Sequence, residues 1–287
     1  MTITALTTYR SEDHPNMLWL EVETRDGIVG LGETFYAAES VEAYIHSNLA
    51  PNVLGMSAID IEAVHYRARP YIGFVGASVE LRARSALDIA LWDVLGKLTG
   101  QPISVLLGGR IRSQIPVYNT CAGNQYVRGT KLGTTQNFGI ASSGTDQNYE
   151  DLDRFLNDPV GLAGSLLDMG IDSMKIWPFD FAAESTQGQF ISPAELDKAL
   201  APFKAIKKEY GDRMQISAEL HGMWNLSESL IICQALDEIG MRWIEDPVFL
   251  TNPTGIQELK RTVRSRIAMG ETRGGADDFK IFLDTGA

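Results

Sequence analysis

Three glutamates recur at one interval in the second half of the chain and could bind a metal ion together. Glu219, Glu245 and Glu271 are spaced 26 residues apart, and each ends a short apolar run. That interval is what one strand, one helix and two short loops need, so it predicts three carboxylates at the same end of successive parallel strands. Carboxylate oxygens are the ligands that Mg²⁺ prefers. The alternative is that these glutamates are ordinary strand-end or helix-capping residues.

Further side chains of suitable chemistry share these predicted strand ends. Alternation along a strand places Lys175 and Trp177 on one side of the preceding strand. By the same alternation His221 lies on the same side as Glu219. An imidazole beside a metal could act as general acid or base, and a lysine could stabilise a developing oxyanion. Asp246 is expected to support the site as a hydrogen-bond acceptor behind the ligands. The alternatives are a capping role for His221, charge neutralisation for Lys175 and plain loop chemistry for Asp246.

The elements that would hold these residues change character near residue 113. In the first part, the alternating residues 17–35 surround a turn at 25–27 and predict a β-hairpin. Three helical patterns follow it, near 39–50, 58–69 and 79–99. Strands followed by helices predict an α+β domain over residues 1–112.

Strand and helix patterns then alternate, which predicts a (β/α) barrel domain over residues 113–287. Strand candidates are 115–120, 173–179, 215–220, 242–246 and 266–271, and helices are expected near 159–169, 193–209, 227–239, 254–264 and 276–285. A closed barrel aims several strand ends at one point, whereas the crevice of an open doubly wound sheet lies at a single switch point. The barrel is therefore favoured. The polar segment 123–157 is expected to be an active-site lid or a disordered insertion.

Composition narrows the class of protein and its partners. The 287 residues are 44% hydrophobic and 22% charged, as in ordinary globular proteins. The net charge of −12 disfavours nucleic acid and anionic membranes as partners. The two cysteines lie far apart and predict no disulfide framework. No secretory signal and no membrane-spanning stretch is recognisable, so we expect a cytoplasmic protein.

Taken together, several segments resemble the enolase superfamily, in its mandelate racemase and muconate lactonizing branch. They are VETRDGIVGLGET (22–34), RARSALDIALWDVLGKLTGQPISVLLGG (82–109), KIW (175–177), AELHG (218–222), WIEDP (243–247) and GET (270–272). The resemblance implies an N-terminal capping domain and a modified (β/α)₇β TIM-type barrel. It also implies Mg²⁺ held by Glu219, Glu245 and Glu271, and a homo-oligomer. Members share a first step in which a base removes the proton α to a carboxylate, giving an enediolate.

Two departures from the family pattern shape the expected activity. Trp177 stands where many members carry the second lysine of a Lys-x-Lys pair, and tryptophan cannot carry a proton. About five βα units are present where the family has eight strands, and the usual His–Asp dyad of the sixth and seventh strands has no counterpart. The barrel is therefore expected to be incomplete at its C-terminus.

The position of His221 resembles that of a histidine in some sugar-acid dehydratases, two residues after the third-strand ligand. We therefore expect a Mg²⁺-dependent carbon–oxygen lyase that dehydrates an acid sugar, a small carboxylate substrate. Lys175 and His221 would be its catalytic residues. The alternatives are a racemase, epimerase or cycloisomerase of the same superfamily, and a catalytically inert, truncated metal-binding homologue.

Overall fold

The computed structural model describes residues 1–70, 78–123, 150–249 and 251–287. These residues form two compact units, one from Met1 to Ile115 and one that begins at Pro116, each with its own hydrophobic core. The predicted lid or insertion at 123–157 falls mostly on residues outside the described ranges. Apart from Gly123, only its last part, residues 150–157, is described, and that part includes a helix.

The first unit is built on a three-stranded antiparallel sheet in the order β1 (Ile3–Tyr9), β2 (Met17–Thr24), β3 (Val29–Phe35). The predicted hairpin is confirmed, with Met17 paired to Phe35 and Glu23 to Val29 across β2 and β3. We did not predict β1 from the sequence, because the threonines in its ITALTTY run weaken the alternation of apolar and polar residues.

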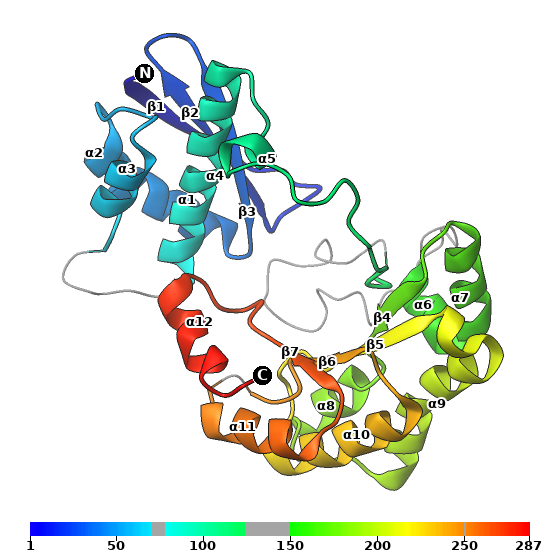
Figure 1. Ribbon diagram of the computed structural model, residues 1–287. Helices are drawn as coiled ribbons and strands as arrows, with labels where there is room; N and C mark the ends of the chain where they lie inside the picture. The colour runs from blue at the N-terminus through cyan, green and yellow to red at the C-terminus, as the bar shows by residue number, and fades with distance from the viewer. Residues whose placement is uncertain (71–77, 124–149, 250) are drawn as a thin grey trace. The chain divides into compact units, whose positions relative to one another are not determined.

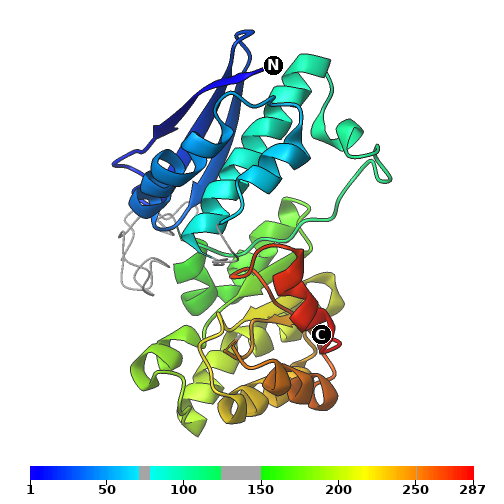
Figure 2. The ribbon, with the colours of Figure 1, turned by 90° about the vertical axis from the view of Figure 1, so that its left-hand side faces the viewer.

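Helices cover one face of this sheet (Figures 1 and 2). They are α1 (Ala38–Tyr44), a π-helical turn (Ile45–Leu49), α2 (Ala50–Val53), α3 (Ile61–Arg67) and α4 (Val79–Thr99). The short α5 (Ile103–Leu106) follows α4 and has no buried residue. The long α4 packs directly against β3. Gly30 and Gly32 permit this approach, because a Cβ on either would collide with the carbonyl oxygen of Ala90 or Ala86.

The second unit contains a parallel sheet in the order β4 (Ser173–Ile176), β5 (Gln215–Glu219), β6 (Trp243–Glu245), β7 (Arg266–Ala268). Three predicted strands are shorter than expected, and one of them is β4, which ends at Ile176 rather than at 179. Residues 115–120 contribute one bridge to β4, from Asn119 to Met174, and Pro116 has no amide hydrogen to donate. β7 ends at Ala268, because Gly270 leaves the extended conformation with a φ of 113°.

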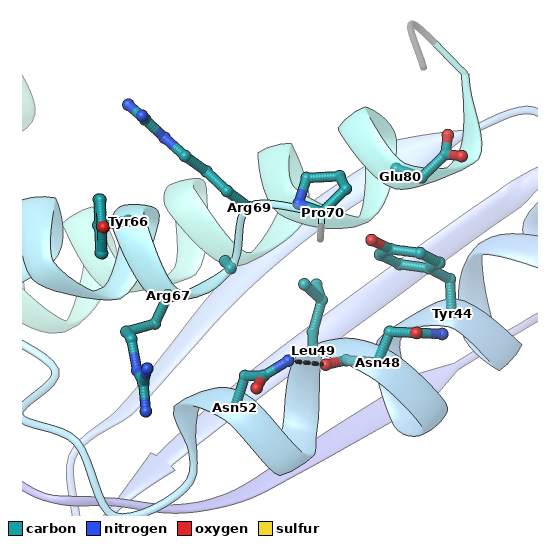
Figure 3. Close-up of a pocket in the computed structure, with 10 residues that line it drawn as sticks. Tyr44, Asn48, Leu49, Asn52, Tyr66, Arg67, Arg69, Pro70 and Glu80 are labelled. Atoms are coloured by element: carbon teal, nitrogen blue, oxygen red, sulfur yellow. Dashed lines mark hydrogen bonds between the residues drawn. The ribbon is translucent and has the colours of Figure 1, made fainter. Parts of the chain in front are cut away.

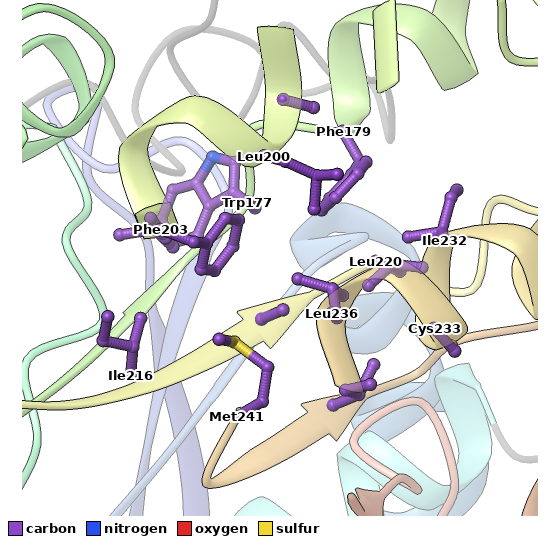
Figure 4. Packing of buried hydrophobic residues seen from close by; sticks show 14 of the residues in the cluster. Trp177, Phe179, Leu200, Phe203, Ile216, Leu220, Ile232, Cys233, Leu236 and Met241 are labelled. Carbon is purple, nitrogen blue, oxygen red and sulfur yellow. The ribbon is translucent and has the colours of Figure 1, made fainter. Parts of the chain in front are cut away.

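Helices alternate with these strands and pack on them. They are α6 (Asp151–Asn157), α7 (Pro159–Asp168), α8 (Asp180–Thr186), α9 (Pro193–Tyr210), a 3₁₀ turn (Gly211–Arg213), α10 (Leu226–Ile239), α11 (Pro253–Thr262) and α12 (Ala276–Leu283). Phe203 of α9, Leu236 of α10 and Ile216 of β5 belong to one buried hydrophobic cluster, part of which is drawn in Figure 4. The parallel order and the alternation confirm the predicted βα organisation, while α6 and α8 were not predicted.

Two expectations from composition can be checked against the structure. Within the ranges described, no helix is both long and apolar enough to cross a membrane. Cys121 and Cys233 are both buried and free, which agrees with the absence of a disulfide framework.

Candidate active site

The carboxyl ends of β4, β5 and β6 bring Lys175, Glu219 and Glu245 into direct contact. Glu219 and Glu245 are partners in the parallel register. The Nζ atom of Lys175 donates to Glu219 Oε2 and to Glu245 Oε1, at 2.7 Å in each case. The three side chains are only 7%, 1% and 15% exposed, in that order. The result is a largely buried cation held between two carboxylates.

The remaining oxygens of these carboxylates also accept hydrogen bonds. Glu219 Oε1 accepts from the backbone N–H of His221 at 3.0 Å. Glu245 Oε2 accepts from Trp243 Nε1 at 2.9 Å. We had not singled out Trp243, although its position two residues before Glu245 puts both on one side of β6. Every oxygen of the pair therefore has a fixed donor.

Trp243 in turn belongs to an aromatic group beside Lys175. Its ring meets that of Tyr118 edge to face, with centroids 5.0 Å apart. The ammonium of Lys175 lies 5.7 Å from the centroid of the Tyr118 ring. This side of the site thus combines hydrogen bonding to Glu245 with an aromatic surface that favours a cation.

His221 is held by two residues from the end of β4 and the helix that follows it. Its Nδ1 atom lies 2.8 Å from Oδ2 of Asp180, the first residue of α8. Its ring meets that of the buried Trp177 edge to face, with centroids 5.6 Å apart. We did not predict Asp180. Its signal in the sequence is an acid three residues after Trp177, in the turn that leaves the same strand.

The turns that follow the two glutamates have strained backbones. His221 and Asp246 adopt left-handed conformations, with φ of 49° and 41°, which non-glycine residues rarely do. Backbone bonds hold them in place: Gly222 N–H donates to Asp246 O at 2.7 Å, and Asp246 N–H donates to Ala268 O at 2.9 Å. Such strain is concentrated at functional sites in proteins.

Asp246 lies behind the glutamate pair and is 1% exposed. Its Oδ1 atom accepts from the backbone N–H of Gly270 at 3.3 Å. Its Oδ2 atom is buried without a hydrogen-bond partner among the residues described. Burial and the negative charge of Glu271 raise the pKa of Asp246 to about 6. The side chain thus has an oxygen that could still accept a hydrogen bond or a cation.

Glu271 is placed differently from the other two glutamates. It lies in the turn after β7 and is exposed. Its charge nevertheless acts on His221 and Asp246. Among the side chains that the structure describes, no group of three or more His, Cys, Asp or Glu is placed to hold a metal ion. The role of Glu271 as a ligand therefore stays a prediction.

The two contacting glutamates differ in their electrostatics. Burial raises the pKa of Glu219 to about 8, against the opposing charges of His221 and Lys175. Burial also disfavours ionised Glu245, but the hydrogen bonds from Lys175 and Trp243 outweigh it and hold its pKa below the usual range. The same carboxylates outweigh the burial of Lys175 and raise its pKa. Lys175 is therefore charged at neutral pH.

The pKa values of the imidazole and of its partner carboxylate are both shifted upward. Burial alone would lower the pKa of His221, but the charge of Asp180 outweighs it and raises the pKa to about 9. Burial raises the pKa of Asp180 as well. Both shifts favour retention of a proton by the pair near neutral pH. This pair can therefore hold or deliver a proton beside Glu219.

The donor set at the strand ends fits Mg²⁺. Its atoms are carboxylate oxygens, which hard divalent cations prefer. Glu219 and Glu245 already hold one cationic group between them. The raised pKa of Glu219 means that Lys175 and His221 offset its burial only in part, so additional positive charge would stabilise its ionised form.

The first unit contains a cavity of about 650 Å³ (Figure 3). Its lining includes Tyr44, Arg67 and Arg69, and Asn52 donates to the backbone oxygen of Asn48 at 2.7 Å. The described lining residues supply one carboxylate and neither histidine nor cysteine. That set suits neither metal binding nor proton transfer, so the candidate active site is the one at the strand ends.

Comparisons with known proteins show the family to which both units belong. Residues 3–108 match the mandelate racemase / muconate lactonizing enzyme N-terminal domain, and residues 160–287 match the enolase C-terminal domain-like family. The crystal structure of an enolase of the mandelate racemase subgroup from Agrobacterium tumefaciens is 39% identical, with a TM-score of 0.85. The match covers 100% of this chain and 68% of that one. The predicted combination of a capping domain with a TIM-type barrel is thereby confirmed.

Two curated relatives carry the name of an activity. A D-galactonate dehydratase from Pectobacterium atrosepticum is 27% identical, over 100% of this chain and 65% of its own length. A D-mannonate dehydratase from Xanthomonas oryzae pv. oryzicola is 25% identical, over 94% of this chain and 62% of its own length. The chain thus spans less than two thirds of the length of either relative.

Proposed function

Because the chain belongs to the mandelate racemase and muconate lactonizing enzyme branch of the enolase superfamily, we propose that it is a Mg²⁺-dependent acid-sugar dehydratase. Relatives named as dehydratases of D-galactonate and D-mannonate support this reaction class. The substrate is a small polyhydroxylated carboxylate, and the overall reaction removes one molecule of water from it.

The observation that carries the proposal is the position of His221. It lies two residues after Glu219 in the turn that leaves β5, and its backbone N–H is bound to that carboxylate. Trp177, which packs on its ring, has an indole that cannot exchange protons with a substrate. We therefore assign proton transfer at this end of the sheet to the imidazole, since Trp177 cannot carry it and Lys175 is bound between two carboxylates.

The carboxylates and the lysine have binding and electrostatic roles. Glu219, Glu245 and Glu271 would hold Mg²⁺, which when bound neutralises the substrate carboxylate and acidifies the neighbouring C–H bond. Lys175 contributes a second, permanent positive charge at the same point. Preorganised charge of this kind stabilises the anion that forms when the α-proton leaves.

Dehydration then requires one proton to be delivered. His221 in its neutral form takes the α-proton, which gives an enediolate, and then delivers that proton to the β-hydroxyl, which leaves as water. The resulting enol becomes the 2-keto-3-deoxy acid by tautomerisation. Atoms balance, since one proton and one hydroxyl group leave the sugar and the protonated hydroxyl departs as water.

A screen of acid sugars with Mg²⁺ tests the proposal. D-galactonate and D-mannonate, together with other aldonic and aldaric acids, are incubated with the protein, and 2-keto-3-deoxy product is measured chromatographically. We expect turnover of at least one acid, and its abolition by chelation of Mg²⁺ and by His221→Gln.

Parallel incubations in deuterated water separate the competing functions. Exchange of the α-proton without formation of keto acid would contradict the dehydratase and support a racemase or epimerase. Absence of exchange with every acid, alongside stabilisation of the fold by Mg²⁺, would support an inert metal-binding homologue. Exchange of the α-proton and formation of keto acid are both measured by proton NMR on the same samples.

A further inference from the structure

We propose that Asp180 is a positioning residue, which fixes the orientation and the tautomer of the His221 ring for proton transfer. The inference rests on the proposed function, because it concerns the same site. Asp180 itself would not touch the substrate. It would act through the hydrogen bond between its Oδ2 atom and His221 Nδ1, which is 2.8 Å long.

The side chain of Asp180 is buried and hydrogen-bonded to the ring of His221. Its side chain is fully buried at the start of α8. Its other oxygen, Oδ1, has no hydrogen-bond partner among the described residues. Nor does the side chain cap its own helix. Burying a carboxylate is costly, and the imidazole of His221 is the side chain to which Asp180 is hydrogen-bonded.

The ring of His221 is restrained from several sides at once. Asp180 holds Nδ1, and Trp177 meets the ring edge to face at 5.6 Å between centroids. Trp177 is itself fixed by an edge-to-face contact with Phe155, at 5.5 Å. The left-handed backbone of His221, bound to Glu219 through its N–H, sets the starting direction of the side chain.

The chemical consequence concerns which ring nitrogen carries hydrogen. An ionised carboxylate only accepts hydrogen bonds, so it requires hydrogen on Nδ1. A proton exchanged with a substrate must then pass through Nε2. Without the carboxylate both tautomers become accessible. The buried aspartate of a serine protease acts on its histidine in this way, and replacing it with asparagine slows that enzyme by about 10⁴-fold.

The test compares two buried aspartates of the same unit. Asp180→Asn changes the proposed positioning residue. Asp237→Asn is the matched control, because Asp237 is 6% exposed and accepts hydrogen bonds from Ser265, before β7. Ring nitrogen chemical shifts are recorded by NMR on ¹⁵N-labelled protein with Mg²⁺. The chain has four histidines, and His221→Gln identifies the signals of His221.

We expect Asp180→Asn to change the ¹⁵N chemical shifts of Nδ1 and Nε2 of His221, because hydrogen is distributed differently between them. Asp237→Asn should leave these shifts unchanged. With a substrate in hand, Asp180→Asn should lower kcat by about 10²-fold or more and change KM by less than about threefold. Unchanged ring signals in Asp180→Asn would overturn the inference. So would equal changes in both variants, because they would indicate general loosening of the fold.

The NMR measurement needs no turnover, so the two proposals can fail separately. If the parent protein dehydrates no acid sugar, the proposed function fails while the ring signals still decide the role of Asp180. If the parent is active and Asp180→Asn keeps its full kcat, the positioning role fails while the dehydratase stands.

Discussion

At the scale of single residues, the site is organised around two neighbouring carboxylates whose four oxygens are all engaged. Lys175 donates a hydrogen bond to one oxygen of each carboxylate. The backbone N–H of His221 and the indole N–H of Trp243 donate to the other two oxygens. Two anions in register on adjacent strands repel each other unless a cation lies between them. The pair is therefore a place where positive charge has a large effect on both stability and chemistry.

Replacing Glu245 with glutamine tests whether this pair binds Mg²⁺. A ligand at about 100 times its Kd stabilises a fold by about 2.7 kcal/mol, so the parent should melt several degrees higher with Mg²⁺. Glu245→Gln should lose that shift, because an amide is a weaker ligand than a carboxylate. Glu238→Gln, at an 82% exposed position, should keep it. A full shift in Glu245→Gln, measured by calorimetry, would refute its assignment as a ligand.

Replacing Lys175 with methionine tests the cation between the glutamates. Removing one partner of a buried ion pair costs about 3–5 kcal/mol, and here two carboxylates lose their counter-charge. Urea unfolding without Mg²⁺ should show a loss of this size, and Mg²⁺ should restore part of it. Lys204→Met, which removes an exposed pair with Asp197, should change stability by less than about 1 kcal/mol. Equal stability of Lys175→Met and the parent would contradict the prediction.

At the scale of elements, one connection between a helix and a strand holds the start of β7 in place. Asp237 near the end of α10 accepts from Arg264 N–H at 2.7 Å, and from Ser265 N–H and Oγ at 2.9 and 2.6 Å. Ser265 directly precedes β7. The helix therefore holds the start of this strand through three hydrogen bonds to one carboxylate.

Asp237→Asn should weaken this connection in a pH-dependent manner. Burial opposes ionisation of Asp237, but the hydrogen bonds from Ser265 and Arg264 outweigh it and lower its pKa from the ordinary 3.8. The contribution is thus present above that value and lost as the pH falls through the lowered folded pKa. We expect a loss of about 1–3 kcal/mol at pH 7. The gap between variant and parent, measured in urea, should close in acid, and a gap that is constant with pH would contradict this.

How far the sequence predicts these elements depends on the kind of signal. The interval between the glutamates follows from the geometry of a βα unit, so it predicted the parallel order and the register of Glu219 with Glu245. The same interval predicted that Glu271 would end a strand, and this was wrong, because β7 stops at Ala268 and Gly270 has a positive φ. A positive φ at a single glycine leaves no periodic pattern of apolar residues in the sequence from which it could be predicted.

Contacts between side chains of different elements were predicted least well. Alternation placed Lys175 beside the glutamates, but α8 was not recognised, and with it Asp180 was missed. A seven-residue helix directly after a strand is too short to show a helical period. Hydrogen bonds such as that of Trp243 to Glu245 depend on rotamers, which no pattern of residue types specifies.

At the scale of the whole molecule, the described residues contain two separate hydrophobic clusters. The first includes Leu20 and Val22 of β2 and the buried face of α4, and the second surrounds the parallel strands. The candidate metal ligands all belong to the second unit. A defect confined to the first core should therefore leave the binding of Mg²⁺ intact.

Gly32→Ala introduces such a defect. A Cβ at this position would collide with the carbonyl oxygen of Ala86 in α4, and overpacking of a core costs about 1–3 kcal/mol. We expect calorimetry to show a lower melting temperature for the first unit, while titration with Mg²⁺ gives the parent's Kd. Leu31→Ala, at a 47% exposed neighbouring position, should change neither property appreciably. Loss of Mg²⁺ binding in Gly32→Ala would mean that the two cores are coupled, since a change on β3 would then control the chemistry at the ends of β5 and β6.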